Sequence, residues 1–90
     1  MVKKDYKPKH FRPGTMIQFV AAPGRWRSEK PRDVGNGLLG QLAVIIEYLG
    51  DDAHQWGGIY SVLLSTGEAT DGRRRFAHYG DFMEAHSESR

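Results

Sequence analysis

Three glycines in the middle of the chain match the spacing of a dinucleotide-binding loop. Gly35, Gly37 and Gly40 read G-x-G-x-x-G. That loop works when a strand precedes it and the N terminus of a helix follows it to hold the pyrophosphate. Here a proline-containing segment precedes the glycines and a β-branched apolar run follows them. The pattern leaves two interpretations, a nucleotide site or a turn leading into a strand, and the absence of a helix signal favours the turn.

Histidine and acidic side chains offer a second set of candidate chemistry. The histidines are His10, His54, His78 and His86, and the chain has no cysteine. None of them has the spacing of a helical metal pair. His78 beside Tyr79 and Asp81 could act as a general base with an orienting acid, or could satisfy hydrogen bonds around a helical turn. Catalysis would also need a nucleophile and an oxyanion site, which the sequence does not show as a coherent set. We therefore predict no catalytic residue, no metal and no cofactor, and hence no enzyme.

Arginines next to aromatic or turn residues are candidates for binding. Trp26 lies between Arg25 and Arg27, so it could stack on a base, anchor a protein interface or fold back over the core. For Trp56 we favour packing, because Gly57-Gly58 indicates a tight turn beneath the indole. In the run 73–75, Arg73 and Arg75 share a strand face and could bind phosphates or carboxylates, or protect a sheet edge from aggregation.

Positive charge is concentrated at the start of the chain. Residues 1–32 contain nine Lys or Arg and two acidic residues, whereas residues 33–90 contain four and nine. A basic arm on a mildly acidic body favours attraction to an anionic surface, and its alternative role is to keep the chain soluble. The predicted partner-binding residues are Lys3, Lys4, Lys7, Lys9, Arg12, Arg25, Trp26, Arg27, Arg32, Arg73 and Arg75.

Length and composition predict one small globular domain. The chain has 90 residues, of which 39% are hydrophobic and 27% charged, too apolar a mixture for general disorder. Its longest apolar run, residues 42–46, is far shorter than the roughly 20 residues of a membrane-spanning helix. Residues 1–10 lack the apolar segment of a signal peptide. We therefore expect a soluble protein that is not secreted.

Alternation and turn signals predict an all-β fold. Residues 15–21 alternate, with Ile17 and Phe19 on one face, and residues 22–36 form a long loop too polar for the core. Residues 40–48 are the central strand, buried on much of both faces, and residues 59–65 form a third strand. A short strand near 68–70, a helical turn at 78–82 and a last strand at 83–85 complete the prediction.

This order of elements resembles a small SH3-like barrel. The resemblance rests on RPGTMIQF, GQLAVIIEYLG, YSVLLSTGE and HYGDFMEA, and it covers residues 12–85. The layout is similar to the SH3-like or KOW-like barrels that tailed bacteriophages encode. It implies an all-β, five-stranded SH3-like barrel with a long first loop and a one-turn helix before the last strand. The first loop departs from peptide-binding SH3 domains because it carries arginines, so polyproline recognition is not expected.

The predicted organisation is an extended basic arm (residues 1–14), a barrel (15–85) and a flexible polar tail (86–90). We expect a non-enzymatic protein–protein interaction module, a small structural or accessory component of a larger assembly such as a phage virion. The alternative is a nucleic-acid-binding barrel that uses the basic arm and loop. Partners are protein subunits or nucleic acid, without a membrane or a small-molecule substrate, in the virion or the host cytoplasm. Deleting residues 1–12 is then expected to leave the melting temperature nearly unchanged but to abolish partner binding.

Overall fold

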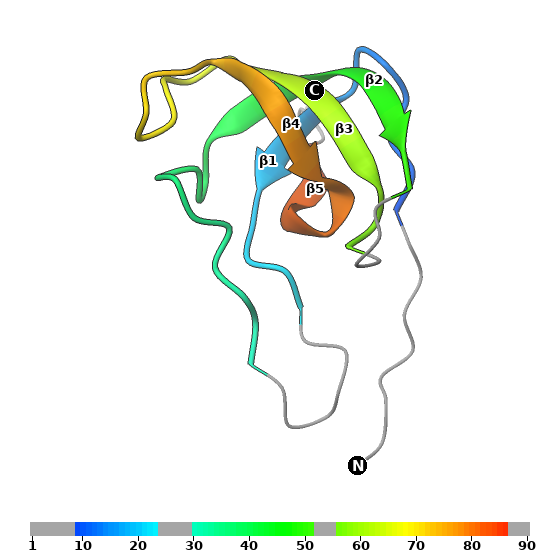
Figure 1. The fold of residues 1–90 in the computed structure, drawn as a ribbon, viewed down its shortest axis with the longest axis horizontal. Coiled ribbons are helices and arrows are strands. Elements are labelled where there is room, and N and C mark those ends of the chain that lie inside the picture. The colour runs from blue at the N-terminus through cyan, green and yellow to red at the C-terminus, as the bar shows by residue number, and fades with distance from the viewer. Residues whose placement is uncertain (1–8, 24–29, 52–55, 87–90) are drawn as a thin grey trace.

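The protein folds into a single antiparallel sheet. A computed structural model describes residues 9–23, 30–51 and 56–86. The elements are β1 (Met16–Phe19), β2 (Leu42–Gly50), β3 (Ile59–Leu64), β4 (Arg75–Tyr79), the 3₁₀ turn η1 (Gly80–Phe82) and β5 (Met83–Ala85). The five strands are ordered β4-β3-β2-β1-β5, so that β4 and β5 are the two edges (Figure 1). The predicted all-β class is confirmed.

The core lies on one face of this sheet because the strands alternate. Ile17 and Phe19 of β1 are fully buried, as their predicted face requires. In β3, Val62 and Leu64 are buried while Leu63 is 40% exposed. The sequence predicts a central strand that is buried on much of both faces. In β2, however, only Ala43 and Ile45 are buried, and the residues beside them are half-buried.

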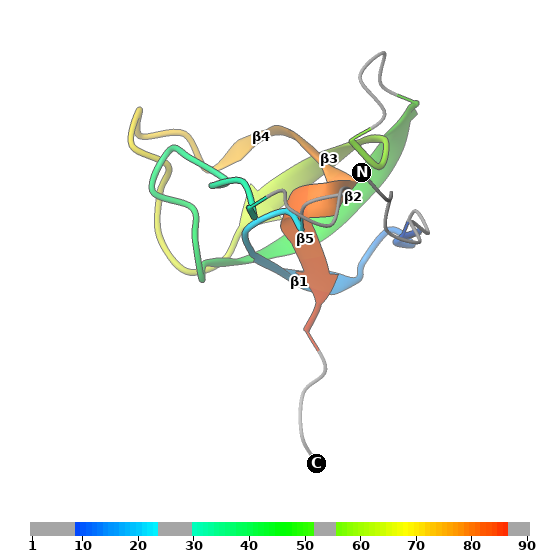
Figure 2. The ribbon, with the colours of Figure 1, turned by 90° about the horizontal axis from the view of Figure 1, so that it is seen from below.

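The sheet curves strongly around this core. The pairing of β2 with β3 shifts register between Ile45 and Glu47 and again between Tyr48 and Gly50. Such bulges bend a strand and increase its twist. As a result the strands wrap around η1, which lies inside the curve in both views (Figures 1 and 2). Residues on η1 therefore join the core, where Phe82 is 8% exposed.

The fourth strand lies later in the chain than the sequence predicts. The expected strand near residues 68–70 is wrong, because those residues belong to the turn between β3 and β4. There the Ala69 N–H donates to the Arg73 carbonyl and the Thr70 N–H donates to the Asn36 carbonyl. The strand instead occupies Arg75–Tyr79, and the helical turn shortens to Gly80–Phe82. The last strand matches its predicted bounds of 83–85.

Two segments expected to lie outside the core contribute to it. Phe11, from the predicted arm, is 8% exposed, and its ring lies 5.5 Å from that of Tyr60 in an edge-to-face contact. In the long first loop, Ala22 and Val34 are buried, and Ala22 exchanges two backbone hydrogen bonds with Arg32. Both segments supply apolar surface that a small sheet needs to cover its open ends.

Candidate functional site: a groove along the free edge of β4

Within the described part of the chain, strand β4 pairs with β3 and lies at the edge of the sheet. The Leu64 N–H donates to the Arg74 carbonyl, and the Gly80 N–H donates to the Gly58 carbonyl. Hydrogen-bonded pairs recur at every second residue of an antiparallel ladder, so Phe76 and His78 also bond to β3. The peptide groups of Arg75, Ala77 and Tyr79 therefore point away from the sheet. Within residues 9–23, 30–51 and 56–86, the outward groups of Arg75 and Ala77 have no hydrogen-bond partner.

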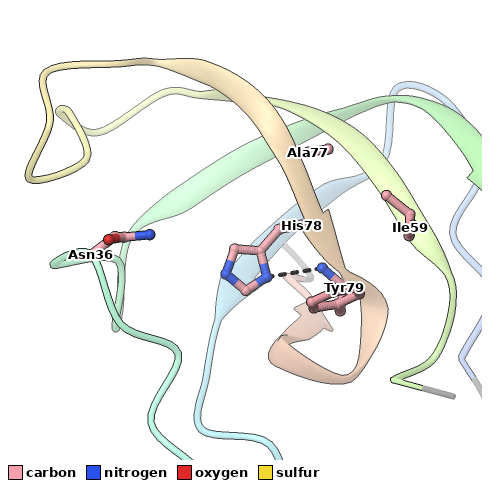
Figure 3. Close-up of a pocket in the computed structure, with 5 residues that line it drawn as sticks. All are labelled: Asn36, Ile59, Ala77, His78 and Tyr79. Carbon is pink, nitrogen blue, oxygen red and sulfur yellow. Dashed lines mark hydrogen bonds between the residues drawn. The ribbon is translucent and has the colours of Figure 1, made fainter. Parts of the chain in front are cut away.

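A depression of about 360 Å³ follows this edge. Its lining residues are Asn36, Ile59, Ala77, His78 and Tyr79. Ala77 and His78 are consecutive strand residues and point to opposite faces of the sheet. A hollow that touches both must run along the backbone edge between them. Figure 3 shows the His78 ring between β4 and Asn36, with Ile59 on the neighbouring strand.

The wall opposite β4 is the glycine-rich loop, which is fixed by hydrogen bonds. Asn36 has a φ of 55°, and the glycines on either side of it also have positive φ, so the chain turns sharply here. The Thr70 N–H donates to the Asn36 carbonyl at 2.9 Å. Gln41 Nε2 donates to the carbonyls of Gly37 at 2.9 Å and Glu68 at 3.1 Å. Since β2 rather than a helix follows these glycines, the loop lacks the helix dipole of a dinucleotide site.

His78 is held between aromatic rings at the inner side of the groove. Its ring lies 5.4 Å from Phe19 and 5.2 Å from Phe82. The Tyr79 N–H donates to His78 Nδ1 at 2.9 Å. Because Nδ1 accepts this hydrogen bond, it has no proton to donate to a carboxylate that could orient the ring as a general base. Burial lowers the pKa of His78 below its ordinary value, and a contact with the Val34 backbone offsets part of this effect. The neutral imidazole therefore acts here as a packing group.

This burial predicts a loss of stability in mild acid. In the unfolded chain His78 has the ordinary pKa of 6.5, whereas the folded pKa is lower. As the pH falls below 6.5 the unfolded state binds a proton that the folded state does not, so the free energy of unfolding decreases until the folded pKa is reached. Melting temperatures of the wild type and of His78→Phe, measured from about pH 7.5 to about pH 5, should therefore diverge. His86→Ala should follow the wild type, and parallel curves for His78→Phe would contradict this assignment.

The predicted partner-binding residues that the structure describes lie in separate parts of the fold. Lys3, Lys4, Lys7, Arg25, Trp26 and Arg27 lie outside the described residues. Lys9 Nζ donates to the Met83 carbonyl at 2.9 Å, on the opposite edge of the sheet from β4. Arg12 is exposed in the turn before β1.

Of the remaining predicted arginines that the structure describes, Arg32 lies in the first loop, and Arg73 and Arg75 lie at the start of β4. The Arg32 guanidinium lies 4.9 Å from the centroid of Trp56, whose ring also stacks on Phe82 at 5.8 Å. Arg73 Nε contacts Asp71 Oδ2 at 2.7 Å, and hydrogen bonds from the Arg73 backbone and side chain hold the pKa of Asp71 below its ordinary value. Arg73 and the exposed Arg75 thus lie where β4 begins.

Sequence reasoning missed Asn36, Ile59 and Ala77 as lining residues. Ile59 pairs with Tyr79 across β3 and β4, and Ala77, the smallest side chain of β4, pairs with Ser61. The alternation of Phe76 and His78 with smaller or polar neighbours is the available strand signal. It is obscured by the three arginines before it, which are typical of a turn.

No protein family, curated protein or solved structure matches this chain. Among the described residues, no cluster of three or more His, Cys, Asp or Glu side chains could hold a metal ion. None of the helices in this part of the chain is long and apolar enough to cross a membrane.

Proposed function

We propose that this chain is a non-enzymatic protein–protein interaction module built on an SH3-like barrel. The strand order β4-β3-β2-β1-β5 and the short 3₁₀ turn before β5 support this fold. The resemblance to small phage barrels supports a role as a structural or accessory component of a virion-like assembly, in the virion or the host cytoplasm. Fold alone does not define an activity, so the role depends on the site.

The observation that carries this proposal is the groove beside the unpaired edge of β4. It combines free backbone groups, a preformed opposite wall and a polar–apolar lining, features with which a folded domain recognises a peptide segment. On the outer face of the sheet, Leu63 pairs with Arg75 of β4 and is 40% exposed. Exposed apolar side chains beside a groove are favourable contacts for a protein partner.

Nucleic-acid binding is the second candidate function, and the observation that favours it is the run Arg73–Arg75. All three residues are exposed where β4 begins. Arginine side chains at such a position could contact successive phosphates, in which case the affinity would fall steeply with salt.

A paired binding experiment tests the proposal. The immobilised protein is used to select from a library of random twelve-residue peptides, and the same protein is titrated with short single- and double-stranded DNA and RNA at low salt. We expect enriched peptides that shift the amide signals of β4 and of the Asn36 loop, together with a solution mass that shows whether the chain self-associates. If no peptide is enriched, or if only salt-sensitive nucleic-acid binding is seen, the proposed interaction module is overturned.

A further inference from the structure

We propose that β4 binds its partner by strand addition, pairing with an extended segment that places a carboxylate opposite Arg75 and an apolar side chain opposite Ala77. This inference rests on the proposed function and specifies the partner's chemistry. It follows from the unpaired backbone of β4, from the shape of the hollow beside it and from the charge at its first residue.

The backbone of β4 is the part of the site that selects an extended partner. Arg75, Ala77 and Tyr79 turn their peptide groups outward, although the Tyr79 N–H already donates to His78 Nδ1. Alternate residues of a strand are about 7 Å apart. Only another strand offers donors and acceptors at that repeat, and the resulting main-chain hydrogen bonds are the usual source of affinity in strand addition.

The other edge of the sheet is less suited to this role. Strand β5 has three residues, whereas β4 has five. On β5 the outward carbonyl of Met83 already accepts a hydrogen bond from Lys9 Nζ at 2.9 Å. Short, capped edges resist strand pairing. The open edge of the sheet is therefore β4.

The hollow at Ala77 defines the apolar position of the partner. Residues that pair across an antiparallel ladder project to the same face, so the partner residue opposite Ala77 lies on the outer face of the sheet. There it meets the small Ala77 side chain and the neighbouring Ile59–Tyr79 pair. A branched apolar side chain fills this space without displacing either neighbour.

The charge of Arg75 at the start of β4 selects an acidic residue on the partner, two positions from the partner's apolar residue. Arg73 is paired with Asp71, and Arg74 Nη2 donates to the Leu64 carbonyl at 3.2 Å. Arg75 has no carboxylate partner among the described residues. Its exposed charge opposes pairing with a second copy in parallel register, where the two Arg75 side chains would be adjacent. A carboxylate on the incoming strand would instead form an ion pair with Arg75, so that charge favours pairing.

The test uses blocked ten-residue peptides of alternating valine and threonine that differ at one central position, which is glutamate, glutamine or lysine. We expect the affinity for the wild-type protein to fall in the order glutamate, glutamine, lysine, with glutamate about fivefold tighter than glutamine because the ion pair is exposed. Arg75→Glu should reverse the order so that the lysine peptide binds best. Lys30→Glu, an equal change of charge at another exposed position, should keep the wild-type order.

A pair of proline substitutions tests strand addition separately from charge. Ala77→Pro removes an outward N–H from β4, and the ladder to β3 survives because it uses Phe76 and His78. Ala85→Pro makes the same change on β5, where Ala85 also points its N–H away from the sheet. We expect Ala77→Pro to weaken the glutamate peptide more than tenfold and Ala85→Pro to bind like the wild type, with both folds checked by circular dichroism.

The outcomes separate this inference from the proposed function. Peptides that bind at β4 with no preference among glutamate, glutamine and lysine would overturn the acidic partner and leave the interaction module standing. Equal binding by Ala77→Pro and the wild type would overturn strand addition. A protein that dimerises through β4, or binds nucleic acid in place of the glutamate peptide at millimolar concentration, would overturn the inference as a whole.

Discussion

Replacing Phe11 with alanine is expected to lower the free energy of unfolding by about 3 kcal/mol, the low end of the range for buried phenylalanine, because the ring lies at the margin of the core. Phe11 is 8% exposed and packs edge-to-face on Tyr60. Its N–H donates to the Tyr60 hydroxyl at 3.4 Å, and that hydroxyl donates to the Lys9 carbonyl at 3.3 Å. For a domain of this size, this loss of free energy of unfolding corresponds to a decrease in melting temperature of about 10 °C or more.

The neighbouring residue provides the control for this prediction. His10 is exposed, so His10→Ala should change the melting temperature very little. Both variants can be compared by thermal unfolding followed by circular dichroism. If Phe11→Ala melts with His10→Ala and the wild type, then Phe11 contributes nothing to the core, and residues 1–12 can be removed without loss of stability as the sequence predicts.

Strands with a sharp contrast between their two faces could be predicted from the sequence. In β1 the apolar Ile17 and Phe19 flank Gln18 and are buried. In β3 the residues 62–64 are all apolar, and the burial of Val62 and Leu64 opposite the exposed Leu63 follows the period of two that a strand imposes. Phe11 could not be assigned in this way, because it stands alone among prolines and basic residues. Its burial depends on Tyr60, which lies 49 residues further along the chain.

The candidate site could be predicted less well than the fold, because long-range contacts create it. Strand β4 shows little contrast between its faces, since Arg75 and Ala77 are exposed and Phe76 and His78 are only half-buried. An edge strand does not need a strong pattern because one of its sides faces solvent. The opposite wall depends on the hydrogen bond between Thr70 and Asn36, which joins two turns 34 residues apart and which no local pattern encodes.

The end of β4 depends on a close approach of two backbone segments. The sequence predicts that Gly57 and Gly58 form a turn beneath the Trp56 indole. In the structure, a Cβ atom on Gly57 would lie 2.5 Å from Asp81 Oδ1, and one on Gly58 would lie 2.8 Å from the Tyr48 ring. The Asp81 N–H donates to the Trp56 carbonyl at 2.9 Å. The absence of a side chain at Gly57 therefore allows η1 to pack closely against this turn. We attribute the end of β4 at Tyr79 to that contact.

Gly57→Ala should consequently destabilise the protein by about 3 kcal/mol, the sum of a left-handed backbone cost of roughly 1–2 kcal/mol and a clash of comparable size. Gly14→Ala is a matched control, because Gly14 has the same φ of 88° but no atom within 4 Å of the position that a Cβ would take. It should lose only about 1 kcal/mol, the backbone cost alone. Urea unfolding of the two variants measures the difference directly. A larger loss of stability for Gly57→Ala than for Gly14→Ala would assign the difference to the contact between Gly57 and Asp81. Equal losses of stability would mean that Asp81 moves to accommodate the new methyl group and that the packing of η1 does not fix the end of β4.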